Sequence, residues 1–520
     1  MKNVDLNLTP EAYFNSELLK NAAAKCLGVK SNEISHVEIV RRSLDSRRSI
    51  LYRCQAEVYM ADETFMPPDF HSPYLDCGNG KRVVIVGAGP AGLFAALHAL
   101  ELGLKPVIVE RGKPVEERRK DITQMVRSGN VNADSNWCFG EGGAGTYSDG
   151  KLYTRSTKRG DVGAVMRKFV EHGADPKITI DSHAHIGTDR LSGIISNMRA
   201  TIEGHGGEIH FNQCVKELII DSTTQRVKGV RCAGGDSFEG CAVLLASGHS
   251  ARDIYTLFHN NQWLLEAKPF ALGVRVEHPQ HLINEIQYHG RNYSPLLPPA
   301  SYSLTTQVDD HGVFSFCMCP GGVIVPASTA QGEQVVNGMS NASRSSAYAN
   351  SGIAVTVAPN DIPEYDKYGS LALLRFQQDI EQRVFNSAGG GLRAPGQRLT
   401  DFCEHRSTGL LNKSNYMGEY VYGELDAMLP QFISNCLRIA FRHFGQKMKG
   451  FYTQDASLLA VESRTSSPVR IPRDQSGQHP QLRGLYPCGE GAGYAGGIVS
   501  SAIDGIKQID QIASNSLSNT

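Results

Sequence analysis

The chain has 520 residues, which is enough for two or three domains. Its hydrophobic fraction of 41% and charged fraction of 20% are ordinary for a globular protein. The balance of 52 basic against 53 acidic residues argues against a strongly basic nucleic-acid surface and against an acidic tail.

Targeting and redox signals point to the cytoplasm. The N-terminus lacks the apolar segment of a signal peptide, and no apolar run is long enough for a transmembrane helix. The 12 cysteines are scattered without C-x-x-C pairs, which favours reduced thiols over a disulfide framework. We therefore expect a cytoplasmic protein without a membrane span.

Residues 1–80 are predicted to form a small α+β domain. A helix is expected from Pro10 to about Leu27, followed by strands at 37–40 and 50–58. Several prolines and Gly78 then mark a linker. The pattern assigns no role to this domain.

Residues 83–110 carry the most informative motif. They read as an apolar strand, a G-x-G-x-x-G turn, a helix and a second strand that closes on Glu110. Gly87 permits the tight turn, Gly89 lets the backbone approach a pyrophosphate, and Gly92 allows close packing of helix on strand. A carboxylate at Glu110 suits ribose hydroxyls and disfavours a 2′-phosphate, so the motif predicts FAD or NAD.

The region from 111 to 250 is expected to continue this domain. Residues 111–176 read as mostly helical with one glycine-rich loop, and 177–250 read as strand, helix and three strands, with one strand at 209–220. His183 and His185 are expected on a strand without further ligands nearby, so no metal site is predicted. Close backbone approach requires glycine, and the loop is therefore predicted to wrap the cofactor through Gly142, Gly143, Gly145 and Lys151.

Two later segments favour FAD over NAD. The buried run 242–248 ends in a small residue and glycine, which lets the backbone pass close to a dinucleotide. Residues 485–498 read as a strand that ends at Gly489 and Glu490, with a helix that begins near Gly497. Glu490 suits a sugar-alcohol hydroxyl, and the helix N-terminus suits negative charge on a flavin ring.

Residues 251–474 are predicted to form an inserted mixed β/α substrate domain. No second strand–GxGxxG–helix unit is evident between 251 and 480, so a dedicated NAD(P)H domain is not expected. The flavin would be reduced by the substrate itself, or by NAD(P)H that binds transiently without a domain of its own.

Taken together, the motifs resemble two-dinucleotide-fold flavoproteins of the glutathione reductase type. Five further segments are similar to an uncharacterised family of FAD-dependent, or NAD(FAD)-utilising, dehydrogenases: CFGEGGAGTYSDGKL (138–152), HIGTDRL (185–191), FCMCPGGVIVPAS (316–328), NGMSNASRSSAYANSG (337–352) and VESRTSSPVRI (461–471). The resemblance covers about residues 80–515 and implies a cofactor but no known substrate. It implies these FAD contacts: Gly87, Gly89, Pro90, Ala91, Gly92, Glu110 and Arg111 at the ADP half, Val215 at adenine, Ser247 and Gly248 at the ribose-pyrophosphate, Gly489 and Glu490 at the pyrophosphate and ribitol, and Gly497 and Ile498 at the flavin.

Candidate catalytic residues are fewer. Arg464, with Glu462 beside it, is predicted to anchor a substrate carboxylate or to stabilise reduced flavin, and a plain ion pair of Arg464 with a nearby acid is an equal alternative. Cys317 and Cys319 are candidates for a redox pair, although small side chains that line the flavin pocket are the favoured interpretation, as for Cys138. Asn337, Arg344 and Asn350 are weaker candidates for substrate contacts.

The sequence therefore predicts an α/β flavoprotein with a Rossmann-like FAD domain of the glutathione reductase type. That domain comprises 81–250 and 475–520, with the substrate domain at 251–474 inserted and the small domain at 1–80 preceding both. The predicted function is an FAD-dependent oxidoreductase that moves a hydride between flavin N5 and a small-molecule substrate. A flavin-dependent RNA-modifying protein and a non-catalytic FAD-bound scaffold or sensor are the alternatives, and the near-neutral charge disfavours the first.

Overall fold

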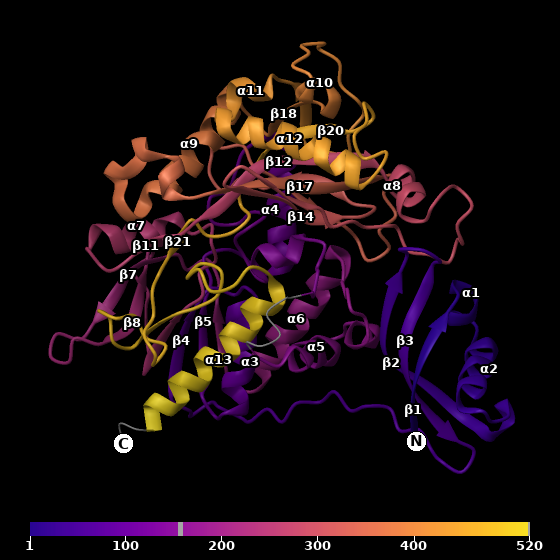
Figure 1. Cartoon of the computed structure of the whole chain (residues 1–520). Coiled ribbons are helices and arrows are strands. Elements are labelled where there is room, and N and C mark those ends of the chain that lie inside the picture. The colour runs from indigo at the N-terminus through magenta and orange to yellow at the C-terminus, as the bar shows by residue number, and fades with distance from the viewer. Residues whose placement is uncertain (154–159, 518–520) are drawn as a thin grey trace.

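The computed structural model describes residues 1–153 and 160–517, and its N-terminal unit is a small antiparallel sheet with two helices (Figure 1). The strand order is β1-β3-β2. The helix predicted from Pro10 to Leu27 is interrupted, because the Asn15 side chain accepts hydrogen bonds from two backbone N–H groups and starts a second helix. The elements are β1 (Lys2–Leu8), α1 (Pro10–Tyr13), α2 (Ser16–Leu27), β2 (Ile34–Asp45) and β3 (Leu51–Met60).

A five-stranded parallel sheet of order β22-β10-β4-β5-β6 forms the centre of the chain. Its edge strand β22 begins about 240 residues after the end of its neighbour β10. The bounds are β4 (Arg82–Val86), β5 (Lys105–Val109), β6 (Glu208–His210), β10 (Ala242–Leu245) and β22 (Leu485–Pro487).

Helices α3 and α13 lie side by side against this sheet (Figure 1). Nearly all of α3 is buried, which explains its almost continuous apolar sequence. The two helices approach closely at Gly505, where a Cβ atom would lie 2.2 Å from the Ala91 carbonyl oxygen. The helices of this region are α3 (Pro90–Glu101), α4 (Val115–Ser128), α5 (Val162–Glu171), α6 (Thr188–Gly204), α7 (Arg252–Asn260) and α13 (Ile498–Leu517).

Two sequence predictions in this region are wrong. The single strand expected at 209–220 is divided, because the chain turns at Asn212 with φ of 57° and enters a separate antiparallel sheet. The strand expected around His183 and His185 does not form. These described residues pair only through isolated bridges such as Lys151–His185. The separate sheet comprises β7 (Val215–Ile220), β8 (Val227–Cys232) and β9 (Ser237–Glu239).

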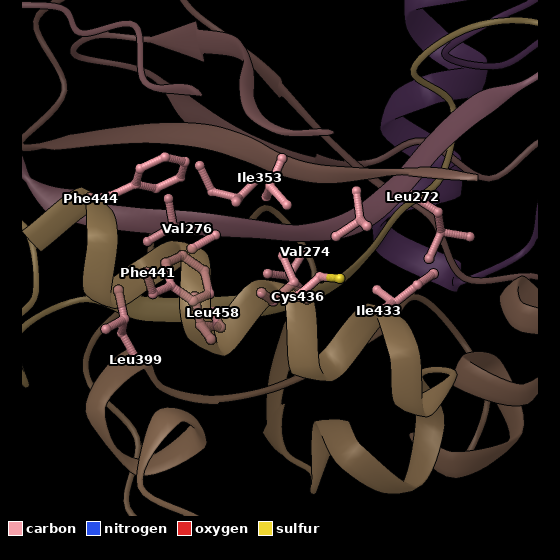
Figure 2. Packing of buried hydrophobic residues seen from close by; sticks show 14 of the residues in the cluster. Leu272, Val274, Val276, Ile353, Leu399, Ile433, Cys436, Phe441, Phe444 and Leu458 are labelled. Carbon is pink, nitrogen blue, oxygen red and sulfur yellow. The ribbon is translucent and has the colours of Figure 1, made fainter. Parts of the chain in front are cut away.

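A seven-stranded sheet of order β13-β14-β17-β12-β20-β18-β19 fills most of the region after α7. Its neighbours are antiparallel except β18 and β19. Helix α12 packs its apolar side on β12, with Ile433 and Phe441 near Leu272, Val274 and Val276 (Figure 2). The strands are β12 (Phe270–Pro279), β13 (Thr305–Val308), β14 (His311–Cys319), β17 (Tyr348–Val357), β18 (Arg393–Arg398), β19 (Glu419–Tyr422) and β20 (Ser457–Glu462).

Shorter elements complete the fold. Two short strand pairs, one with two residues per strand and one with four, and several helices connect or cover the large sheet. In the residues that the structure describes, no helix combines the length and apolar character that a membrane crossing requires. The remaining elements are β11 (Glu266–Ala267), α8 (Gln280–Gln287), β15 (Val323–Pro326), β16 (Val336–Met339), α9 (Ala372–Ser387), α10 (Leu399–Cys403), α11 (Leu425–Met428), α12 (Gln431–Lys447) and β21 (Val469–Arg470).

Candidate functional site

A cavity of about 1130 Å³ lies at the carboxyl ends of the parallel strands. Residues that directly follow β4, β5, β10 and β22 form one wall, and residues of β14 and its neighbouring loops form the opposite wall. The carboxyl ends of parallel strands are where ligands of open α/β sheets bind. The cavity is therefore the candidate site.

The turn after β4 is the strand–turn–helix unit that the sequence predicts. Gly87 has φ of 106°, and a Cβ atom there would lie 2.5 Å from the Ala246 carbonyl oxygen. A Cβ atom on Gly92 would lie 1.9 Å from the Gly87 carbonyl oxygen. Gly89 is the N-cap residue of α3 and has no side chain that could accept a hydrogen bond from the first N–H groups of the helix. These N–H groups therefore face the cavity without a capping partner.

Glu110 connects three backbone segments at the cavity wall. One carboxylate oxygen accepts a hydrogen bond from the Ala88 N–H group at 2.8 Å. The other accepts from the Gly112 and Gly140 N–H groups at 2.9 and 3.0 Å. The carboxylate thus fixes the glycine turn against the glycine-rich loop, a role that sequence reasoning did not assign, while its predicted contact with a ribose stays a prediction.

Arg118 holds the glycine-rich loop and was not predicted. Its fully buried guanidinium donates hydrogen bonds of 2.7–3.2 Å to loop carbonyl oxygens. Burial without a directly paired carboxylate lowers the pKa of Arg118 below its usual value. Because these carbonyl oxygens point toward Arg118, other groups of the loop face the cavity. The acceptors are the carbonyls of Asn136, Trp137, Gly140, Glu141 and Gly143.

The end of the cavity beside β5 and β7 has a fixed arginine. Arg111 forms ion pairs with Asp134 at 2.8 Å and Asp253 at 3.0 Å, and its guanidinium lies over the Phe139 ring. Val215, the first residue of β7, also lines this end. The adenosine contact that the resemblance implies for Arg111 and Val215 stays a prediction.

The helix α13 begins at the other side of the cavity. Gly497, with φ of 158°, directly precedes its first residue, Ile498, and both line the cavity. Glu490 also lines it and lies 3.6 Å from a ring nitrogen of His249. Burial raises the pKa of Glu490 to about 7 and lowers the pKa of His249 to about 4, so near neutral pH His249 is uncharged and Glu490 is about half ionised.

Arg464 is the centre of a buried ion-pair network. Its guanidinium contacts Glu381 at 2.7 and 2.9 Å and Glu333 at 3.2 Å. Arg252 pairs with the same two carboxylates, each at 2.7 Å. Arg464 touches the cavity edge, but the two carboxylates occupy its guanidinium, which favours the ion-pair alternative over a substrate anchor.

Glu462 faces another buried arginine. It pairs with Arg275, which also donates hydrogen bonds to Asn350 at 2.8 Å and to the Cys317 carbonyl oxygen at 2.7 Å. Burial raises the pKa of Glu462 to about 7 despite this cation. Glu462 and Asn350 are absent from the described cavity wall, so neither reaches the site directly.

The candidate residues divide between the cavity wall and the layer behind it. Within the described chain, Gly92, Gly142, Glu462 and Cys319 lie behind the wall, and the Gly142 position faces Thr146 and Ile195. The predicted residues in the wall are Gly87, Gly89, Pro90, Ala91, Glu110, Arg111, Gly143, Gly145, Lys151, Val215, Ser247, Gly248, Cys317, Arg464, Gly489, Glu490, Gly497 and Ile498. The weaker candidates Cys138, Asn337 and Arg344 also line the cavity.

Family models match three parts of the chain. Residues 82–119 match an FAD binding domain, and residues 269–465 match a C-terminal-domain-like model of FAD-dependent proteins. Residues 1–59 match a domain of unknown function. An uncharacterized protein of Clostridium beijerinckii is 36% identical over 537 residues, which cover 98% of each chain.

The chain belongs to a family of FAD-dependent flavoproteins. FAD is the cofactor of this flavoprotein, as the sequence predicts, while its membership of the glutathione reductase type stays a prediction. The cavity fits the dinucleotide: Gly89 and Gly143 bring their backbones together at the start of α3, where a Cβ atom on Gly143 would lie 3.1 Å from the Gly89 Cα atom. Such a bare backbone cradle suits a pyrophosphate.

Solved structures with similarity to the flavoprotein have low sequence identity. A geranylgeranyl bacteriochlorophyll reductase-like protein from Thermoplasma acidophilum is 12% identical with a TM-score of 0.37, over 85% of this chain and 79% of that chain. A glycerol-3-phosphate dehydrogenase from Bacillus halodurans, complexed with FAD, is 10% identical with a TM-score of 0.37, over 85% of this chain and 66% of that chain.

Proposed function

We propose that the flavoprotein is an oxidoreductase that transfers a hydride between FAD and a small-molecule substrate. The observation that carries the proposal is the shape of the cavity, which continues from the glycine turn of the parallel sheet to β14 of the seven-stranded sheet. The part of the first wall after β4 and β5 lies in the residues matched by the FAD binding domain, and β14 of the other wall lies in the residues matched by the C-terminal model. A cofactor on the first wall would leave its reactive ring accessible to a substrate on the second.

The residues of the first wall would hold FAD. The N–H groups at the start of α3 would bind the pyrophosphate, and Glu110 would meet the ribose from its fixed position. The N-terminus of α13 would stabilise negative charge at the pyrimidine end of the flavin. When bound, FAD supplies the hydride acceptor or donor, and the protein supplies orientation and electrostatics.

The residues of the second wall would position the substrate. Lys151, Asn337 and Arg344 line it, and Arg344 is held by Asp149 at 2.6 Å. Lys151 lies 3.8 Å from the same carboxylate and donates a hydrogen bond to the Met318 carbonyl oxygen. Two cations share one carboxylate here, so we propose that this wall accepts a polar or anionic substrate group.

The purified protein should be yellow, with the two visible absorption bands of an oxidised flavin. Adding NADH and NADPH separately without oxygen then tests the electron donor. Bleaching would establish a reductase and direct the search to acceptors, and a flavin that stays oxidised would point to reduction by the substrate itself. A colourless protein that cannot be reconstituted with FAD would refute the proposal.

The affinity for FAD should fall as the pH rises through 7, because of Glu490. Its carboxyl group lines the cavity and has a pKa raised to about 7 by burial. A bound pyrophosphate favours the neutral carboxyl, so binding takes up a proton and weakens by up to about tenfold per pH unit above 7. Fluorescence titration of the flavin between pH 6 and 8.5 measures this.

The control uses a second buried carboxyl group. Burial also raises the pKa of Glu277 to about 7, but Glu277 lies on β12, outside the described cavity wall. Glu490→Gln should flatten the pH dependence, and Glu277→Gln should leave it as in the wild type. An equally steep dependence in Glu490→Gln would assign the effect to another group.

A further inference from the structure

The backbone of β14 is irregular where it reaches the cavity. Its pairing with β17 shifts register between Phe316 and Cys319, and Cys317 has φ of 45°, a left-handed conformation that is uncommon for a residue other than glycine. β-bulges re-aim side chains, often next to active sites. Here the half-buried Cys317 lines the cavity, whereas Cys319 is fully buried behind it.

The irregular backbone brings two thiols together. The Cys319 sulfur donates a hydrogen bond to the Cys317 carbonyl oxygen at 3.3 Å, so the second thiol lies directly beside the backbone of the first. In a regular strand, side chains two residues apart would stand separately on the same face. The contact therefore depends on the bulge.

Cations surround this pair. Arg275 donates to the Cys317 carbonyl oxygen, and Lys151 donates to the carbonyl oxygen of the next residue, Met318. The hydrogen bond from Cys319, together with Lys151 and Arg275, lowers the pKa of Cys317 to about 5, while that of Cys319 is raised. Burial instead raises the pKa of the thiols of Cys54, Cys77, Cys214, Cys232, Cys403, Cys436 and Cys488.

We propose that Cys317 and Cys319 form a hydroperoxide-reducing thiol pair in the wall of the cavity. The Cys317 sulfur attacks one oxygen of a hydroperoxide, so that an S–O bond forms and the O–O bond breaks. The departing oxygen takes a proton and leaves as water or an alcohol, and Cys317 becomes a sulfenic acid. Lys151 lies where its charge would stabilise the departing oxygen.

The second step uses the neighbouring thiol. The Cys319 sulfur attacks the Cys317 sulfur, an S–S bond forms, the S–O bond breaks, and water leaves with the proton of Cys319. In total two thiols are oxidised and one hydroperoxide is reduced. A disulfide between residues two apart closes a short, strained ring, so we expect dithiothreitol to reduce it readily. This activity does not depend on the proposed hydride transfer.

Hydrogen peroxide is the probe in the decisive experiment. The FAD-loaded protein is treated with one equivalent, the remaining thiols are blocked with N-ethylmaleimide, and the peptides are mapped by mass spectrometry. The peptide with both cysteines should lose two hydrogen atoms and take up no maleimide, and dithiothreitol should reverse this. A peptide that keeps two free thiols while other cysteines are oxidised would overturn the proposal.

Three variants separate the roles. In Cys319→Ser, dimedone should capture a sulfenic acid on Cys317, and in Cys317→Ser, the Cys319 thiol should survive the peroxide. Cys26→Ser removes an exposed thiol of α2, outside the cavity wall, and should respond as the wild type does. Flavin content and thermal unfolding report whether each variant is folded, and the dimedone result decides even if Cys317→Ser does not fold.

The pH profile of alkylation gives a second readout. Between pH 6.5 and 8.5, the rate of iodoacetamide reaction at Cys317 should change less than about twofold, because its thiolate is already formed, whereas an ordinary thiol of pKa about 8.5 gains thiolate steeply in this range. Cys319→Ala, which removes the donor, and Lys151→Met, which removes the charge, should each restore a rate that rises with pH. A wild-type rate that climbs about tenfold per pH unit would refute the reactive thiolate.

Discussion

Replacing Gly92 with alanine should abolish the binding of FAD. The new Cβ atom would lie 1.9 Å from the Gly87 carbonyl oxygen, and that oxygen belongs to the turn that we propose as the cofactor cradle. Either α3 moves away from β4 or the turn opens, and both displace the N–H groups that would face the pyrophosphate. We expect FAD affinity to fall at least about a hundredfold and stability to fall by about 1–3 kcal/mol, the usual cost of overpacking.

A second helical glycine provides the control. Gly193 lies in α6, where an added Cβ atom would meet nothing within 4 Å. Gly193→Ala should keep full flavin content and raise stability by up to about 1 kcal/mol through helix propensity. Flavin content per chain and denaturant unfolding measure both variants. Full flavin content in Gly92→Ala would show that the turn tolerates the displacement.

Replacing Arg118 with methionine should release the glycine-rich loop. The substitution removes the hydrogen-bond donors of a fully buried guanidinium and leaves several loop carbonyl oxygens without their partner. Unsatisfied buried carbonyls cost about 1–3 kcal/mol each before relaxation, so we expect a loss of about 3 kcal/mol or more and a flavin affinity lowered by an order of magnitude or more. Calorimetry and flavin titration test this expectation.

Two further variants distinguish the loss of the loop's hydrogen bonds from the general effect of removing a positive charge. Arg119 is exposed on the same helix, and Arg119→Met should change neither stability nor flavin affinity noticeably. Arg118→Lys should recover only part of the loss, because an ammonium group offers three donors where the planar guanidinium offers five. Wild-type flavin affinity in Arg118→Met would show that the loop does not depend on this residue.

Local patterns allowed the first half of the site to be predicted. The glycine turn at Gly87 and the acid at Glu110 belong to one βαβ unit, whose spacing is fixed by backbone geometry over some 25 residues. The small strand β22 and the start of α13 were also predictable, because Gly489 and Gly497 mark both ends of the intervening loop. FAD as the cofactor followed from these segments together and is confirmed.

Contacts between residues far apart in the sequence explain which parts of the site could not be predicted. Arg118 stands in a run of charged residues, and nothing in that run indicates that its partners are carbonyl oxygens about 20 residues later. The partners of Arg464 come from two separate segments, so the sequence could not choose between an anchor and an ion pair. The bulge at Cys317 likewise depends on pairing with β17, which a strand pattern does not reveal.

The position of β22 in the parallel sheet has a consequence for synthesis. The sheet takes four strands from residues 82–245, but its last strand and the helix beside α3 come from residues 485–517. A chain emerging from the ribosome therefore carries an open sheet edge and an uncovered α3 until the whole intervening region has been made. Such long-range pairing is slow, and exposed strand edges promote aggregation. We therefore expect flavin loading to wait until residues beyond 485 have been translated, and a ribosome stalled before that point should hold a nascent chain that is colourless and dependent on chaperones.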